Sequence, residues 1–237
     1  MTSRPAVLHA WYLSGEDYPG FPLELGGGHG WGLVLDDPAD PRLIACMTTE
    51  GALLRDLTSG RETVISAPDT GAIFYGWGRF VSSGREEGSR PDLLMTGTTD
   101  GQVFLWDLEG RPAPGWPVHL KGFIYGVRAE MEHHVVYGPP ITADVDGDGE
   151  NEIILGSYDQ HLYCFELDGS LVPGWPVVLD DFIIQTIALA QLDGEGGKEL
   201  VVGQYGETLF AFHIDQLRGG SGEQAEHCLL YTSPSPR

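Results

Sequence analysis

A spaced pattern of aromatic residues, glycine and proline occurs three times in this chain of 237 residues. In each copy an aromatic residue is followed four positions later by glycine. Four positions after that glycine comes a Pro-Gly-aromatic-Pro run. The copies occupy residues 11–22, 106–117 and 165–176. A spacing that is kept this closely indicates a repeat protein, in which each repeat is one supersecondary unit.

Weaker copies of the same unit lie between and after the three strong ones. Residues 51–60 and 207–215 keep the apolar run but lack the Pro-Gly-aromatic-Pro part. The equivalent positions are then 11, 55, 106, 165 and 212, with steps of 44, 51, 59 and 47 residues. Steps of this length are typical of the blades of a propeller rather than of a helical solenoid.

The local pattern inside each repeat is that of β-hairpins. Residues 92–110 and 153–168 alternate apolar runs with short turns, several of them Asp-Gly or Glu-Gly. Such turns between apolar runs favour hairpins, and no stretch keeps a helical period. Because one hairpin unit cannot bury both of its faces, the units must stack on one another. We therefore predict an all-β fold, a β-propeller fragment of about five repeats, some incomplete, over residues 1–227.

Residues 144–152 carry carboxylates at alternate positions of a loop that contains two glycines. The candidate ligands are Asp144, Asp146, Asp148, Glu150 and Glu152. Carboxylate oxygens gathered on a tightly turning loop are the ligands that Ca²⁺ prefers. An EF-hand is excluded because its twelfth position here is Leu155 and both flanks read as strands. The alternative is an acidic, solvated hairpin turn that binds nothing.

A second acidic loop follows 47 residues later, at the same place in the repeat. Asp193, Glu195, Gly197 and Glu199 take its third, fifth, seventh and ninth positions, but Gln191 replaces the first aspartate. Fewer charged ligands lower the affinity for calcium. The sequence leaves open whether this loop is a weaker calcium site or a lost one. The earlier copies, residues 36–42 and 82–92, lack the carboxylate pattern and are predicted to be ordinary loops.

The order of acidic loop, strand, turn, strand and Asp-Gly turn resembles the FG-GAP or VCBS-type repeat, which includes the propeller heads of integrin α-chains. The resemblance covers residues 5–215 and is strongest over residues 141–215. It implies structural calcium, held by the side chains of Asp144, Asp146, Asp148 and Glu152 and by the backbone carbonyl of Glu150. The Phe-Gly-Gly-Ala-Pro element of that family is not intact in this sequence.

The charge of the chain excludes several classes of partner. The formal net charge is −22, and Lys121 and Lys198 are the two lysines. A nucleic-acid partner or an anionic membrane surface would require a basic face, and no apolar run is long enough to insert into a membrane. Calcium and the family resemblance imply an extracellular, cell-surface or periplasmic location. No signal peptide is visible, and the natural start of the chain is left open.

The last ten residues, 228–237, resemble the translation of a sequencing-library adapter, so we interpret them as a non-native tail. The natural protein is then expected to be longer. With Cys228 set aside, Cys46 and Cys164 remain, each in an apolar run. Two cysteines make neither a disulfide framework nor a zinc site, and we predict buried free thiols.

The function that these features favour is a non-catalytic, calcium-stabilised scaffold that binds protein or polysaccharide across the loops at one end of the ring. Trp116 and Trp175 are predicted to pack between neighbouring blades, with sugar stacking as the alternative. The rival hypothesis is the propeller portion of a secreted enzyme, such as a polysaccharide lyase or a quinoprotein dehydrogenase. The sequence shows no phosphate loop or dinucleotide fingerprint, and no catalytic triad can be argued from it.

Overall fold

The computed structural model contains four four-stranded antiparallel sheets and one two-stranded hairpin. It describes residues 6–25, 32–37, 40–48, 51–66, 78–83, 90–98, 101–120, 136, 138–184, 187–192, 194, 197–205, 208–214 and 229–232. The named elements in these ranges are all strands, as predicted. The same ranges contain no helix that is long and apolar enough to cross a membrane.

Each sheet is formed by four strands that are consecutive in the chain. Sheet 1 contains β3 (Gly32–Leu35), β4 (Leu43–Thr48), β5 (Gly51–Asp56) and β6 (Glu62–Ser66). Sheet 2 contains β7 (Arg79–Val81), β8 (Leu93–Gly97), β9 (Gln102–Asp107) and β10 (Val118–His119). Sheet 3 contains β11 (Ile141–Ala143), β12 (Glu152–Gly156), β13 (His161–Phe165) and β14 (Val177–Val178). Sheet 4 contains β15 (Ala188–Ala190), β16 (Glu199–Gly203), β17 (Thr208–His213) and β18 (Leu229–Thr232).

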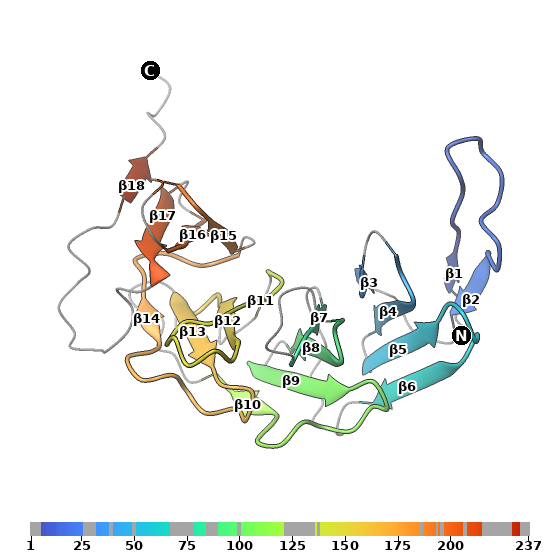
Figure 1. The fold of residues 1–237 in the computed structure, drawn as a ribbon, viewed down its shortest axis with the longest axis horizontal. Coiled ribbons are helices and arrows are strands. Elements are labelled where there is room, and N and C mark those ends of the chain that lie inside the picture. The colour runs from blue at the N-terminus through green and yellow to red at the C-terminus, as the bar shows by residue number, and fades with distance from the viewer. Residues whose placement is uncertain are drawn as a thin grey trace, which may run out of the picture.

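The sheets follow one another in chain order along an open arc (Figure 1). The first strand of each sheet lies toward the inside of the arc and the last strand toward the outside. The repeat positions predicted from the sequence, Arg55, Trp106, Phe165 and Phe212, all lie on the third strand of their sheets. One repeat therefore corresponds to one sheet, which confirms the period of the pattern.

The core consists of layers between consecutive sheets. Ile153 and Leu155 of β12 pack in one cluster with Leu105 of sheet 2. Ile154, which points to the opposite face of the same strand, packs in another cluster with Leu200 of sheet 4. Alternate side chains of a strand face opposite sides, so a sheet that is covered on both sides needs a continuous apolar run. This is why β12 is buried along its whole length.

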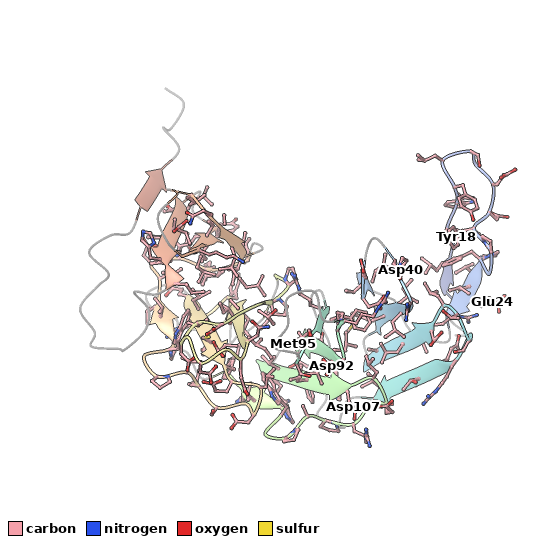
Figure 2. The ribbon with its side chains drawn as sticks, in the orientation of Figure 1. Tyr18, Glu24, Asp40, Asp92, Met95 and Asp107 are labelled. Atoms are coloured by element: carbon pink, nitrogen blue, oxygen red, sulfur yellow. The ribbon has the colours of Figure 1, made fainter. Side chains whose placement is uncertain are left out.

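The N-terminal hairpin corresponds to the outer half of a sheet. It pairs β1 (Ala6–Leu8) with β2 (Leu23–Leu25) and carries an isolated bridge between Trp11 and Asp17. The bridges from Trp106 to Pro112 and from Phe165 to Leu171 have the same spacing in sheets 2 and 3. Trp11 is nevertheless 60% exposed whereas Trp106 is 2% exposed, because the face of sheet 2 that carries Trp106 packs against sheet 1. The hairpin, with Tyr18 and Glu24, stands at one end of the arc (Figure 2).

Cys46 and Cys164 are buried and free, as predicted. They lie on β4 and β13. Burial raises the pKa of both thiols, since a thiolate is disfavoured away from water. Both cysteines therefore serve as small apolar core residues.

The last ten residues contribute one strand. Residues 229–232 form β18, which pairs antiparallel with β17. In sheet 4 this strand takes the outer position that β6, β10 and β14 hold in the other sheets. The rest of the tail, including Cys228, lies outside the described residues.

Candidate metal centre

The first acidic loop connects β11 to β12 at one end of sheet 3. Its turns are made by Gly147 and Gly149, whose φ angles of 84° and 91° are in the region that glycine adopts most easily. Within the loop the backbone N–H groups of Gly147 and Asp148 donate to the side chains of Asp144 and Asp146, at 2.5 and 3.0 Å. These local bonds hold the first two aspartates in place.

Three of the five predicted ligands come together. Carboxylate oxygens of Asp144, Asp146 and Glu152 all lie within 4.8 Å of one another. Asp148 lies outside this group, and one of its oxygens accepts a 2.7 Å hydrogen bond from the backbone N–H of Glu150. Glu150 was expected to contribute its backbone carbonyl rather than its side chain, and its side chain is likewise outside the group.

Glu152 is the buried member of the group, whereas Asp144 and Asp146 are exposed. Its Oε2 accepts a hydrogen bond from the backbone N–H of Val145 at 2.5 Å. Its Oε1 is buried and has no hydrogen-bond partner in the part of the chain that the structure describes. The pKa of Glu152 is raised to about 7, mainly by burial and then by the negative charges of Glu166 and Asp146, against the opposing backbone bonds from Val145 and Asp146. Negative charge near the Glu152 carboxyl group is thus not balanced by positive charge from the described residues.

A fourth acid borders the loop from the neighbouring strand. Glu166 follows β13 and is half-buried. Its pKa is raised by burial first and then by the charges of Asp146 and Asp148. Such a concentration of carboxylates fits a hard divalent cation, because oxygen ligands and negative charge are what Ca²⁺ requires. The arrangement offers no nitrogen or sulfur ligand of the kind that zinc sites use.

The second acidic loop connects β15 to β16 in the equivalent place. Asp193 and Glu195 lie outside the described residues, so the structure places two of its four predicted ligands. Gly197 is exposed, and its carbonyl accepts a 2.6 Å hydrogen bond from Nε2 of Gln191. Glu199 is buried, and its Oε2 accepts a 2.6 Å bond from the backbone N–H of Leu192.

Comparison with known proteins identifies the fold of the chain. No protein-family model and no curated protein matches this chain. The computationally designed Ika8 protein and BamB from Moraxella catarrhalis each share 16% sequence identity with it over 88% of its length, with TM-scores of 0.51 and 0.53. BBS1N, solved in complex with ARL6DN, shares 12% identity over 80% of the chain, with a TM-score of 0.52. This chain has a β-propeller fold.

The propeller chain spans about half the length of these solved chains, between 50 and 53%. Its four sheets are propeller blades, and sheets 1 to 4 are called blades 1 to 4 from here on. Similarity at this level of identity concerns the fold. The acidic loops are therefore interpreted from their own geometry.

In blades 1 and 2, too, an aspartate accepts hydrogen bonds from the opposite end of the loop between the first two strands. The sequence predicted ordinary loops there, and we call these contacts carboxylate clamps. Asp36 accepts bonds from the backbone N–H groups of Arg42 and Leu43, both at 2.9 Å. In blade 2 Asp92 accepts from the backbone N–H of Ser83 at 2.7 Å and from its hydroxyl group. Sequence reasoning missed these clamps because it searched for several carboxylates, whereas one at either end of the loop is enough.

The Pro-Gly-Trp-Pro run of blade 2 docks on blade 3. Trp116 is buried, its Nε1 donates to the carbonyl of Leu167 at 2.9 Å, and its ring lies edge-on to Phe165. A Cβ on Gly115 would lie 1.7 Å from the carbonyl oxygen of Asp168, so only glycine fits there. These contacts confirm that Trp116 packs between blades, and Trp175 is buried between blades 3 and 4.

A buried polar cluster at the other end of blade 3 was not foreseen. Asp159 is fully buried and accepts a 2.7 Å bond from the hydroxyl group of Tyr163. It also accepts from the backbone N–H of His161 at 3.1 Å. Part of the signal was present in the sequence, because His161 and Tyr163, two positions apart on β13, lie on one face of that strand.

A cavity of about 310 Å³ lies between blades 1 and 2. Arg42, Arg61 and Arg90 line it together with acidic and apolar residues. Arg90, from the loop of blade 2, forms ion pairs with Asp36 at 3.4 Å and with Asp40, both from blade 1. Arg90 is therefore a contact that joins the two blades.

Proposed function

We propose that this chain is a non-catalytic, calcium-stabilised β-propeller scaffold of the FG-GAP or VCBS type. One observation carries the proposal: the buried Oε1 of Glu152 has no hydrogen-bond partner among the described residues, in a loop that brings Asp144 and Asp146 close to it. Burying a carboxylate without full compensation is costly, because water no longer solvates its charge. A divalent cation between the three carboxylates would remove that cost.

Calcium is the cation that suits the donor set. The ligands would be carboxylate oxygens of Asp144, Asp146 and Glu152, with the backbone carbonyl of Glu150 and the exposed Asp148 completing the shell. Calcium accepts six to eight oxygen ligands with variable geometry, whereas magnesium demands a near-ideal octahedron and keeps its waters. A loop of nine consecutive residues rich in glycine meets the calcium requirement more easily.

The role proposed for the cation is structural. Its ligands belong to one loop that connects the first two strands of blade 3, so binding would fix that connection. Ligands supplied from a single contiguous segment leave little room for the open position that a catalytic metal needs. We infer that calcium fixes the conformation of the loop between the first two strands of blade 3.

The interaction role rests on the fold and the charge. Propeller loops project from a rigid scaffold and are suited to binding, and BBS1N, a neighbour in fold, was solved in complex with ARL6DN. A net charge of −22 favours a partner with a basic contact surface, or a polysaccharide held through calcium. Calcium-binding modules that work outside the cell have dissociation constants of about 10⁻⁴–10⁻³ M, and a structural calcium site would be filled there. We therefore propose a location at the cell surface, in the periplasm or in the medium.

Thermal unfolding of the full chain in millimolar Ca²⁺ and in chelator tests the calcium site. We expect a higher melting temperature with Ca²⁺, corresponding to about 2.7 kcal/mol when calcium is at a hundred times its dissociation constant. Asp146→Asn and Glu152→Gln should remove most of this rise. In chelator Glu152→Gln should melt no lower than the wild type, since a neutral amide costs less to bury than a carboxylate.

The matched control is Glu24→Gln, which removes one negative charge from the exposed hairpin and should keep the full response to calcium. Equal melting temperatures of the wild type with and without Ca²⁺ would refute the site. The acidic run would then be a solvated turn.

A further inference from the structure

The two acidic loops are flanked by equivalently paired strands, so they can be compared residue by residue. In blade 3 Ala143 pairs with Glu152 across β11 and β12, and in blade 4 Ala190 pairs with Glu199 across β15 and β16. Each loop thus starts after an alanine that faces the glutamate at its end. Both glutamates are buried and accept a backbone N–H bond from the second loop residue.

The first loop residue also caps the turn in the same way in both blades. Oδ1 of Asp144 accepts from the backbone N–H of Gly147 at 2.5 Å, and Oε1 of Gln191 accepts from that of Gly194 at 3.0 Å. The bond from Gly194 also determines which end of the Gln191 amide is oxygen, because a backbone N–H needs an acceptor. The nitrogen of the amide therefore points elsewhere.

That nitrogen is the first difference between the loops. Nε2 of Gln191 donates to the carbonyl of Gly197 at 2.6 Å, and Gly197 holds the seventh position, which is Glu150 in the first loop. An ionised aspartate has no proton to donate, so Asp144 cannot make this bond. In the first loop a cation is proposed to join the first side chain to the seventh carbonyl. In the second loop an N–H group does so.

The second difference lies on the neighbouring strand. Glu199 pairs with His213 across β16 and β17, and Nδ1 of His213 lies 3.0 Å from Oε1 of Glu199, although at an angle that does not make a hydrogen bond. In blade 3 the register that pairs Ile153 with Phe165 puts Glu166 in the place of His213. The buried glutamate thus faces an imidazole in blade 4 and another carboxylate in blade 3.

We propose that the second acidic loop is a cation-independent counterpart of the first. The amide of Gln191 and the imidazole of His213 take the places that calcium would fill, so this loop is closed by the protein alone. Gln191 and His213 are positioning residues that decide whether a loop of this shape requires a metal. The proposal resolves the choice between a weaker and a lost site in favour of a lost one, and it does not use Asp193 or Glu195.

Hydrogen–deuterium exchange on the full chain, with peptides that cover each loop, tests the proposal. In chelator the peptide that contains Leu192 and Gly194 should keep the protection it has in Ca²⁺. Gln191→Glu is nearly isosteric and removes the N–H donor while keeping an acceptor. It should lower the protection of this peptide at least tenfold in chelator and leave the peptide around residue 146 unchanged. A second-loop peptide that loses protection in chelator in the wild type would overturn the proposal.

Calorimetric titration with CaCl₂ tests the proposal independently, because it measures the number of calcium ions bound per chain. The wild type should bind one ion per chain, and a stoichiometry of two would overturn the inference. This stoichiometry depends on the proposed function, whereas the effect of Gln191→Glu in chelator does not. Failure of calcium to bind blade 3 would therefore refute the calcium scaffold without touching the role of Gln191.

The converse change uses a double variant of the first loop. Asp144→Gln combined with Glu166→His introduces both donors into blade 3. We expect the peptide around residue 146 to become insensitive to chelator, and the fitted number of calcium ions to fall by one. A first loop that stays as sensitive to chelator as the wild type would count against the proposal.

Discussion

Three acidic residues are buried among the described residues, and their partners differ. Asp159 accepts bonds from the hydroxyl group of Tyr163 and from the backbone N–H of His161, both on β13. Glu199 has one backbone donor and lies next to His213, although its Oε1 accepts no hydrogen bond among the described residues. Glu152 accepts from the backbone N–H of Val145, and its Oε1 has no hydrogen-bond partner among the described residues. A buried charge is tolerated when it is paired and hydrogen-bonded. Oε1 lacks a hydrogen-bond partner in both Glu152 and Glu199 among the described residues, but Glu152 also lies close to Asp144 and Asp146, so it is the residue that points to a missing ion.

The Asp159 cluster makes a prediction about pH. The hydrogen bond with the Asp159 side chain is the largest cause that raises the pKa of His161, and burial opposes it. The folded pKa thus lies above the unfolded value of about 6.5. Protonated His161 therefore stabilises the fold fully below about pH 6.5, and this stability is lost as the pH rises through the folded pKa.

Urea unfolding of the wild type and of His161→Gln measures this effect. The difference in the free energy of unfolding between them should be larger at about pH 5.5 than at about pH 8.5. The comparison of two variants cancels the repulsion of the other charges, which also changes with pH. A difference that stays constant with pH would contradict the assignment.

At the scale of elements, the Pro-Gly-aromatic-Pro run joins one blade to the next. In blade 2 Gly115 packs against the Asp168–Gly169 turn of blade 3, and Trp116 bonds to Leu167. The N-terminal hairpin carries the same run, but a Cβ added to Gly20 would meet no atom within 4 Å. The two glycines have nearly equal φ angles, 80° and 85°, so they differ only in their surroundings.

Gly115→Ala and Gly20→Ala therefore form a matched pair. Both changes carry the cost of a positive φ, about 1–2 kcal/mol. Gly115→Ala also forces blades 2 and 3 apart, and we expect it to lower the free energy of unfolding by at least about 2 kcal/mol more than Gly20→Ala. Chemical denaturation of both variants checks this. Equal losses would show that the run does not couple the blades.

At the scale of the whole molecule, three apolar layers hold the four blades together. The N-terminal hairpin stands at one end of the arc, outside these layers (Figure 1). Five of its apolar side chains are largely exposed: Val7, Trp11, Tyr12, Leu13 and Tyr18. The hairpin packs on blade 1 mainly at its base, where Leu8 contacts the cluster of Cys46 and Leu53. Local opening is easiest where few apolar contacts are lost.

Chymotrypsin should therefore cut first in the tip of the hairpin, after Tyr12, Leu13 or Tyr18. Sites of the same type inside the blades, such as Tyr163 and Phe165, are buried and should be cut only after global unfolding. Mass spectrometry of a time course identifies the order of cleavage. First cuts within blades 2 or 3 would contradict the layered core.

The sequence by itself determined the repeat, its period and the strands that carry Trp106 and Phe165, because hydrophobic alternation and turn residues act locally. It also determined the acidic loop between the first two strands of blade 3. Only the tertiary structure decided which carboxylates meet, since Asp144, Asp146 and Glu152 converge while Asp148 does not. It alone paired Gln191 with Gly197 and His213 with Glu199. Those partners depend on strand register and on burial, and burial arises only when neighbouring blades pack together.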